Sequence, residues 1–142
     1  MPQITRRGRS AAIMASLHEL VTAEDRQALA DLGFMALGQA RPDLAVPLFE
    51  GLVALSPPGG TAIEAAAIGL GMAHVGIGEP EKAVGILRDA PPSESVTLYL
   101  AIALAGSGKI AEAREMLEDL LALGADPAHA TLARETLEGL PT

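Results

Sequence analysis

The chain contains no cysteine and no tryptophan, and only 2% of its 142 residues are aromatic. The absence of cysteine excludes a disulfide scaffold and any metal site built on thiolates. Because 49% of the residues are nevertheless hydrophobic, the core must be built from alanine, leucine, isoleucine and valine. That mixture favours closely packed helices over a sheet rich in aromatic and β-branched side chains. The composition therefore predicts an all-α protein.

Long apolar runs are also missing. A membrane-spanning helix requires a stretch of about 18 apolar residues, and the sequence contains none. The first residues also lack the apolar core of a signal peptide. We therefore expect a cytoplasmic protein. The length suits a single domain.

Positive charge is scarce, because 10 Lys and Arg residues stand against 18 Asp and Glu residues, for a net charge of −8. Broad contact with nucleic acid needs basic side chains that displace counterions from phosphates, so this balance argues against a nucleic-acid partner. Arg6, Arg7 and Arg9 form the one basic cluster of the sequence. They fall in residues 1–9, which we predict to be a disordered tail.

What the chain does contain is a repeated pattern of small and large apolar residues. The first copy, residues 26–57, predicts a helix, a tight turn and a second helix that ends at Pro57, and residues 64–93 and 94–127 repeat its offsets. The matching positions are Leu32, Gly33, Ala45, Phe49 and Leu52 in the first copy, Leu70, Gly71, Ala83 and Leu87 in the second, and Leu100, Ala101, Ala113, Leu117 and Leu120 in the third. Such units cannot bury their apolar faces alone, so the copies must stack.

The segments that flank the repeats predict covering helices. Ser10 is placed to cap a helix over residues 10–21, which would serve as a cap for the stack or as a docking helix for a second protein. The apolar residues of this helix fall on one stripe: Ile13, Met14, Leu17, Leu20 and Val21. Thr22 and Asp25 have the spacing of a capping signal for the first repeat helix.

At the other end, Asp126-Pro127 predicts the start of a last helix over residues 128–140. Its leucines would cover the open face of the third repeat: Leu132, Leu137 and Leu140. Terminal units of a stack need such covers to remain soluble. We therefore expect residues 10–142 to form one domain.

Patterns for catalysis fail when they are checked residue by residue. Residues 106–109 read GSGK, but Ala103 occupies the position of the first glycine of a phosphate loop and Ile110 that of its Ser or Thr. Residues 69–74 fail the dinucleotide fingerprint, because His74 replaces its last glycine. The three histidines, His18, His74 and His129, lack carboxylates at ligand spacing. We therefore predict no enzyme activity, no cofactor and no metal.

The repeated pattern resembles the tetratricopeptide repeat. That resemblance implies antiparallel helical hairpins stacked as a right-handed superhelix, with the first helix of each repeat facing a concave groove. It implies the following groove positions: Gln27, Ala30, Phe34, Leu37 and Gly38; Ala65, Ile68, Met72, Val75 and Gly76; Ser95, Leu98, Ile102, Ala105 and Gly106. The large side chains among them are apolar, and the glycine at the last position of each set would let a ligand come close.

The phrase LADLGFMALGQARPDLAVPLFEGLVALSP, in a small protein of three repeats with an extra N-terminal helix, looks like the small repeat chaperones of bacterial type III secretion systems (the YscG-like branch). That resemblance implies a cytoplasmic chaperone that holds an amphipathic helix of a needle subunit, together with a second small helical co-chaperone. The predicted partner-binding residues are Phe34, Leu37, Ile68, Met72, Val75, Leu98 and Ile102.

A second hypothesis is a general scaffold or regulatory repeat protein, including a homodimer closed through its own groove or its N-terminal helix. The sequence does not decide between the two.

Overall fold

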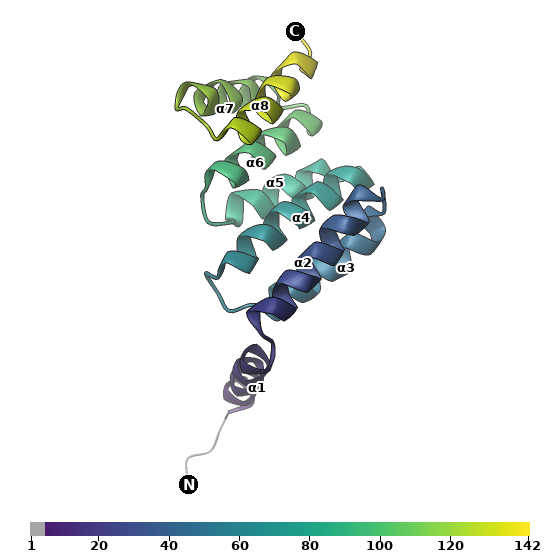
Figure 1. Cartoon of the computed structure of the whole chain (residues 1–142), viewed down its shortest axis with the longest axis vertical. Coiled ribbons are helices and arrows are strands. Elements are labelled where there is room, and N and C mark those ends of the chain that lie inside the picture. Colours follow the sequence, from purple (N-terminus) through teal and green to yellow (C-terminus); the bar gives the residue numbers. More distant parts are fainter. Residues whose placement is uncertain (1–4) are drawn as a thin grey trace.

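The computed structural model describes residues 5–142, apart from the side chains of residues 14, 15, 17 and 18. Within that range the chain forms eight helices and no strand (Figure 1): α1 (Arg6–Leu20), α2 (Ala23–Gly38), α3 (Pro42–Ala54), α4 (Thr61–Ile77), α5 (Pro80–Asp89), α6 (Glu94–Gly106), α7 (Ile110–Ala122) and α8 (Pro127–Gly139). The all-α prediction is confirmed. Helices α2 to α7 form three hairpins stacked in series, and α8 packs against the last of them.

The three hairpins share one turn geometry. A backbone N–H just beyond the first helix donates to a carbonyl in the last turn of that helix; the pairs are Arg41 to Ala36, Glu79 to His74 and Lys109 to Leu104, at 2.8, 2.8 and 2.9 Å. The residue before each donor has a positive φ, which Gly78 and Gly108 adopt easily and Ala40 adopts at 56°. The tight turn predicted between the two helices of each copy is therefore confirmed in all three hairpins.

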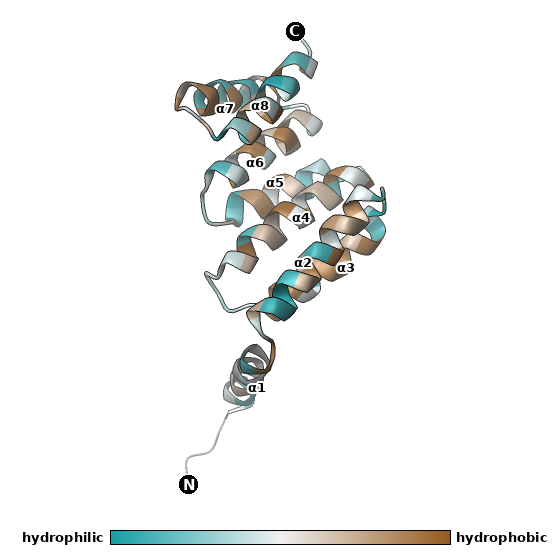
Figure 2. Cartoon of the chain, viewed as in Figure 1, coloured by the Kyte–Doolittle hydropathy of each residue, from teal (hydrophilic) through white to brown (hydrophobic). Residues whose placement is uncertain are grey.

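The same three-residue packing unit recurs inside each hairpin. An alanine near the start of the second helix is fully buried, and four residues later a large side chain, also buried, shares the core with a small residue of the first helix. The alanines are Ala45, Ala83 and Ala113; the large side chains are Phe49, Leu87 and Leu117; the small residues are Gly33, Gly71 and Ala101. Figure 2 shows the resulting hydrophobic residues along α4 and α6, whereas the first turns of α2 are hydrophilic.

The N-terminal helix differs from its prediction. It begins at Arg6 instead of residue 10, because the Thr5 hydroxyl accepts a hydrogen bond from the Gly8 N–H (3.0 Å) and caps the helix before Ser10 is reached. The expected tail over residues 1–9 is thus wrong for residues 6–9, and residues 1–4 lie outside the described part. The stripe residues Met14 and Leu17, and His18, have side chains outside the described set.

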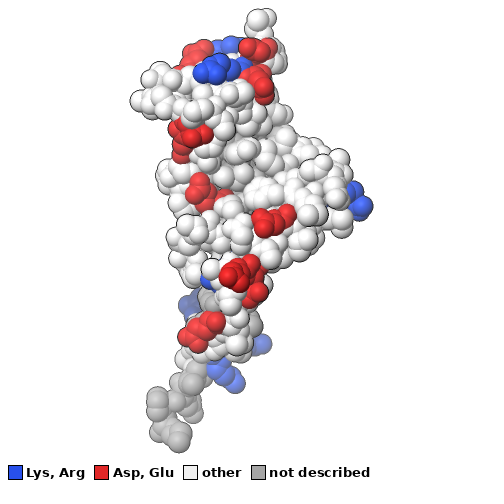
Figure 3. Space-filling view, in the orientation of Figure 1, with Lys and Arg blue, Asp and Glu red and all other residues white. Residues whose placement is uncertain are grey.

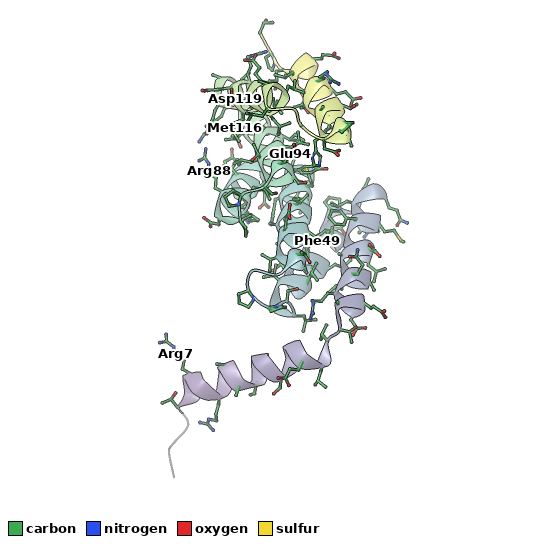
Figure 4. All side chains as sticks on the ribbon, turned by 60° about the vertical axis from the view of Figure 1, so that its left-hand side comes forward. Arg7, Phe49, Arg88, Glu94, Met116 and Asp119 are labelled. Atoms are coloured by element: carbon green, nitrogen blue, oxygen red, sulfur yellow. The ribbon has the colours of Figure 1, made fainter. Side chains whose placement is uncertain are left out.

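Helix α1 projects from the stack as a separate arm and contacts none of the other seven helices in the described range (Figures 1 and 4). The next helix, α2, begins as predicted. Thr22 accepts from the Asp25 N–H at 3.0 Å, and Asp25 accepts from the Thr22 N–H at 2.9 Å, which completes a capping box.

The C-terminal helix covers the third hairpin as expected. It begins at Pro127, one residue earlier than predicted, and the Asp126 carboxylate caps it by accepting from the Ala128 N–H at 3.1 Å. Its partly buried leucines pack on a core cluster that includes Leu98 and Leu117; they are Leu132, Leu137 and Leu140. In the described range, no helix combines the length and the apolar composition that crossing a membrane requires.

Candidate functional site

The first helices of the three hairpins form a continuous inner layer. Helix α2 contacts α4, and α4 contacts α6, whereas α3, α5 and α7 make no contacts among themselves in the described range. Neighbouring hairpins therefore lie closer together on the side of α2, α4 and α6. We call the exposed side of these three helices the inner face.

A hollow of about 390 Å³ opens on the inner face between the C-terminal ends of α2 and α4. Its lining carries no charged side chain and consists of Leu37, Ala40, Pro42, Met72 and Gly76. Two of the seven predicted partner-binding residues, Leu37 and Met72, thus line one hollow. Both are half-buried.

Phe34 lies one turn before Leu37 on the same helix and is 40% exposed. Its ring meets the buried Phe49 ring edge-on, with centroids 4.9 Å apart and an interplanar angle of 69°. This geometry is a favourable aromatic arrangement that holds one edge of Phe34 while the rest of the ring stays accessible. Phe34 is therefore a fixed apolar anchor on the inner face.

Three more predicted residues are half-buried and shared between the inner face and the core. Ile68 and Val75 pack against the cluster that includes Val84 and Leu87, and Ile102 packs against the cluster that includes Leu117. Substituting these side chains would disturb the fold as well as the surface.

Leu98 does not fit its predicted role. It is 0% exposed and lies in a core cluster with Leu117 and Ala133, because α8 packs on α6 at the place where a fourth hairpin would continue the stack. The spacing of apolar residues along α6 could not separate a side chain facing the groove from one facing the next helix.

Two of the three glycines at the ends of the predicted sets, Gly76 and Gly106, have a different role. A Cβ added at Gly76 would lie 3.3 Å from Pro42 Cβ, and one added at Gly106 would lie 3.4 Å from Pro80 Cβ. These glycines therefore accommodate the proline that starts the second helix of the preceding hairpin, instead of a ligand. Gly38, which has no preceding hairpin, has nothing within 4 Å.

A second hollow, of about 300 Å³, lies at the opposite end of the α2–α4 seam, where three predicted groove residues line it: Gln27, Ala30 and Ala65. Arg26 also lines it, and its guanidinium donates to the Val21 carbonyl at 2.8 Å. The inner face is thus polar where α2 begins and apolar where α2 ends.

A Ser–His–carboxylate arrangement, which the sequence analysis missed, joins α6 to α8. Ser95 Oγ and His129 Nε2 are 3.2 Å apart, and His129 Nδ1 is hydrogen-bonded to the Glu94 carboxylate, which also accepts from the Asp126 N–H at 3.2 Å. Neither Ser95 nor His129 lines the hollow beside Glu94, whose residues are Glu94, Thr97, Met116, Asp119, Leu120 and Leu123. We interpret the arrangement as a tie between two helix N-termini.

No charged side chain lines the apolar hollow, and Figure 3 shows charged groups of both signs spread over one face of the molecule. Arg41 forms a paired contact with Asp43 at 2.9 and 3.0 Å, and that hydrogen bonding lowers the pKa of the Asp43 carboxyl. The Lys82 ammonium, 2.7 Å from Glu79, likewise lowers the pKa of that carboxyl. Among the described residues, no group of three or more His, Asp or Glu side chains is placed to hold a metal ion.

Comparison with family models, curated proteins and solved structures gave no match to this chain. The geometry of the inner face is therefore the basis for assigning a role.

Proposed function

We propose that the chain is a non-enzymatic binding protein of the tetratricopeptide type, which holds an amphipathic helix of a partner protein against its inner face. The observation that carries this proposal is the uncharged hollow of Leu37, Met72 and Gly76, with the exposed Phe34 ring one turn away. Apolar grooves of this kind accept helices through large side chains spaced three or four residues apart.

Phe34 and Met72 differ in how rigid a surface they offer to such a helix. The Phe34 ring is held by Phe49 and offers a rigid surface, whereas a methionine side chain adapts its shape to different anchors. Because the hollow carries no charged side chain and the chain as a whole has a net charge of −8, the partner helix we expect has an apolar stripe flanked by lysine or arginine.

The narrower form of the proposal is a cytoplasmic chaperone for a needle-type subunit of a type III secretion system, acting with a second small helical co-chaperone. Its support is the resemblance of residues 26–127 to the small repeat chaperones of those systems, together with the apolar inner face. By covering the apolar stripe of a subunit that would otherwise polymerise, the chain would keep that subunit monomeric.

The test uses a fluorescein-labelled helical peptide with leucines on one stripe and lysines on the other side, and a peptide of the same composition in scrambled order. We expect the first peptide to bind and Phe34→Glu or Met72→Glu to weaken binding by about tenfold or more, since truncated anchors typically cost above about 1 kcal/mol. Val53→Glu on α3, a site 42% exposed, is the matched control. Equal binding by both inner-face variants, or by the scrambled peptide, would refute the proposal.

A further inference from the structure

The first hairpin has an open face at the position where the other two hairpins contact their predecessor. In α4 the side chains turned toward the preceding hairpin are small and buried, and in α6 their equivalents are buried or half-buried; they are Ala66, Gly69 and Ala73, and Val96, Tyr99 and Ala103. The equivalent residues of α2 are exposed: Ala28, Asp31 and Met35. The space at Gly38, filled by a proline at Gly76 and Gly106, is also vacant.

This open face of α2, which we call the α2 end face and define by Ala28, Asp31, Leu32 and Met35, exposes much apolar surface. Leu32 is 51% and Met35 is 57% exposed. Terminal units of stacked repeats need a cover, and contiguous exposed apolar residues on a protein surface mark a contact. At the C-terminal end α8 provides that cover, and at the N-terminal end nothing in the described range does.

Helix α1 is the element without a packing partner. It contacts no other helix, and its Ile13 and Leu20 are 61% and 77% exposed. With 15 residues it is about 22 Å long, which nearly matches the 16-residue α2. The capping box at Thr22 and the Arg26 bond to the Val21 carbonyl hold the junction so that α1 points away from its own stack (Figure 4).

Charge favours pairing of α1 with an α2 end face. Helix α1 carries Arg6, Arg7 and Arg9, whereas Asp31 lies within the α2 end face and Glu24 lies one turn before Ala28. Asp31 occupies the register position that Gly69 and Tyr99 fill in the other hairpins, so a neutral apolar cover would leave a carboxylate buried without a cation. Figure 3 shows basic side chains at the α1 end of the molecule, and mainly acidic with some basic side chains along the stack.

We propose that two copies of this chain exchange their first helices, with α1 of each copy lying across the α2 end face of the other. Ile13 and Leu20 then contact Leu32 and Met35, and the arginines lie beside Asp31. The exchange is two-fold symmetric, so each dimer buries this contact twice. It leaves the inner face free and does not depend on what the inner face binds.

The mass in solution tests the exchange. Multi-angle light scattering should give twice the 14.5 kDa chain mass. The dissociation constant of the dimer should rise at high salt, because salt screens exposed charge pairs. Met35→Glu and Leu32→Glu should raise the dimer dissociation constant by at least about tenfold with unchanged helical circular dichroism. Leu123→Glu, at a site 86% exposed at the far end of the stack, should not. A monomeric wild-type chain, or a dimer that survives both variants, would overturn the proposal.

Since the chain has no cysteine, single thiols identify which chain supplies α1. Ser16→Cys in α1 and Ala28→Cys in α2, made in separate chains with different tags, are mixed and treated with a bismaleimide. A cross-linked product that carries both tags supports the exchange. A link that forms only in the double variant and within one chain shows that α1 covers its own stack, which contradicts it.

Discussion

Phe49 shows how a single residue can join two hairpins. The ring is 0% exposed and lies against Gly33 of α2 and Gly69 of α4. A Cβ added at these glycines would lie 2.6 Å and 2.2 Å from Phe49 Cζ. The glycines are therefore needed for close approach of three helices to one ring, and not for an unusual backbone conformation.

Gly69→Ala separates this packing requirement from helix propensity. Alanine favours a helix interior by about 1 kcal/mol over glycine, but overpacking a filled core costs about 1–3 kcal/mol, so we expect a net loss of stability in urea unfolding. Gly85→Ala in α5, where nothing lies within 4 Å, is the control and should stabilise the protein. Phe49→Leu combined with Gly69→Ala should recover part of the loss. Equal effects of the two glycine substitutions would contradict this account.

At the scale of the element, the capping box makes the start of α2 sensitive to acid. Hydrogen bonds from Thr22 lower the pKa of the Asp25 carboxyl in the folded protein. A carboxyl whose pKa is lower folded than unfolded contributes stability above its unfolded pKa, and that contribution is lost as the pH falls through the folded pKa. The α2 cap should therefore weaken on acidification.

Thr22→Ala tests this coupling, because it removes the acceptor for the Asp25 N–H and the side-chain part of the pKa shift, while the Thr22 backbone N–H still donates to the Asp25 carboxylate. We expect a loss of about 1 kcal/mol at neutral pH, measured by urea unfolding. Between neutral pH and about pH 3, the variant should lose less stability than the wild type does. Thr131→Ala on the exposed side of α8 is the control, and its pH dependence should match the wild type. An unaltered pH dependence in Thr22→Ala would show that the Thr22 side chain does not contribute to the acid sensitivity of the α2 cap.

The sequence predicted those features of each hairpin that depend only on residues of the same hairpin. The positions of Ala45 and Phe49 and the tight turn between the two helices follow from residues within one hairpin, and the structure confirms them. The role of Gly76 and the burial of Leu98 depend on the neighbouring hairpin and on α8, which a local pattern does not specify. The early start of α1 at Arg6, capped by Thr5, was not predicted, because Ser10 offered a second capping residue in the same segment.

For the whole molecule, the core is divided into three clusters along the stack. One joins the first hairpin to α4, one joins α4 to α7 around Leu87, and one joins α6 and α7 to α8 around Leu117. Each hairpin contacts only its neighbours in the described range. In such a stack, stability is a sum of unit and interface contributions, so a local defect should stay local.

Leu117→Ala provides the test, because Leu117 is 0% exposed in the cluster at the C-terminal end. Deleting a buried leucine side chain costs about 2–5 kcal/mol. Hydrogen exchange read by mass spectrometry should then show faster exchange in α6, α7 and α8, with α2 and α3 unchanged. Leu52→Ala, at the equivalent depth of the first hairpin, should produce the opposite distribution. Faster exchange along the whole chain in either variant would mean that the three clusters unfold as one cooperative unit.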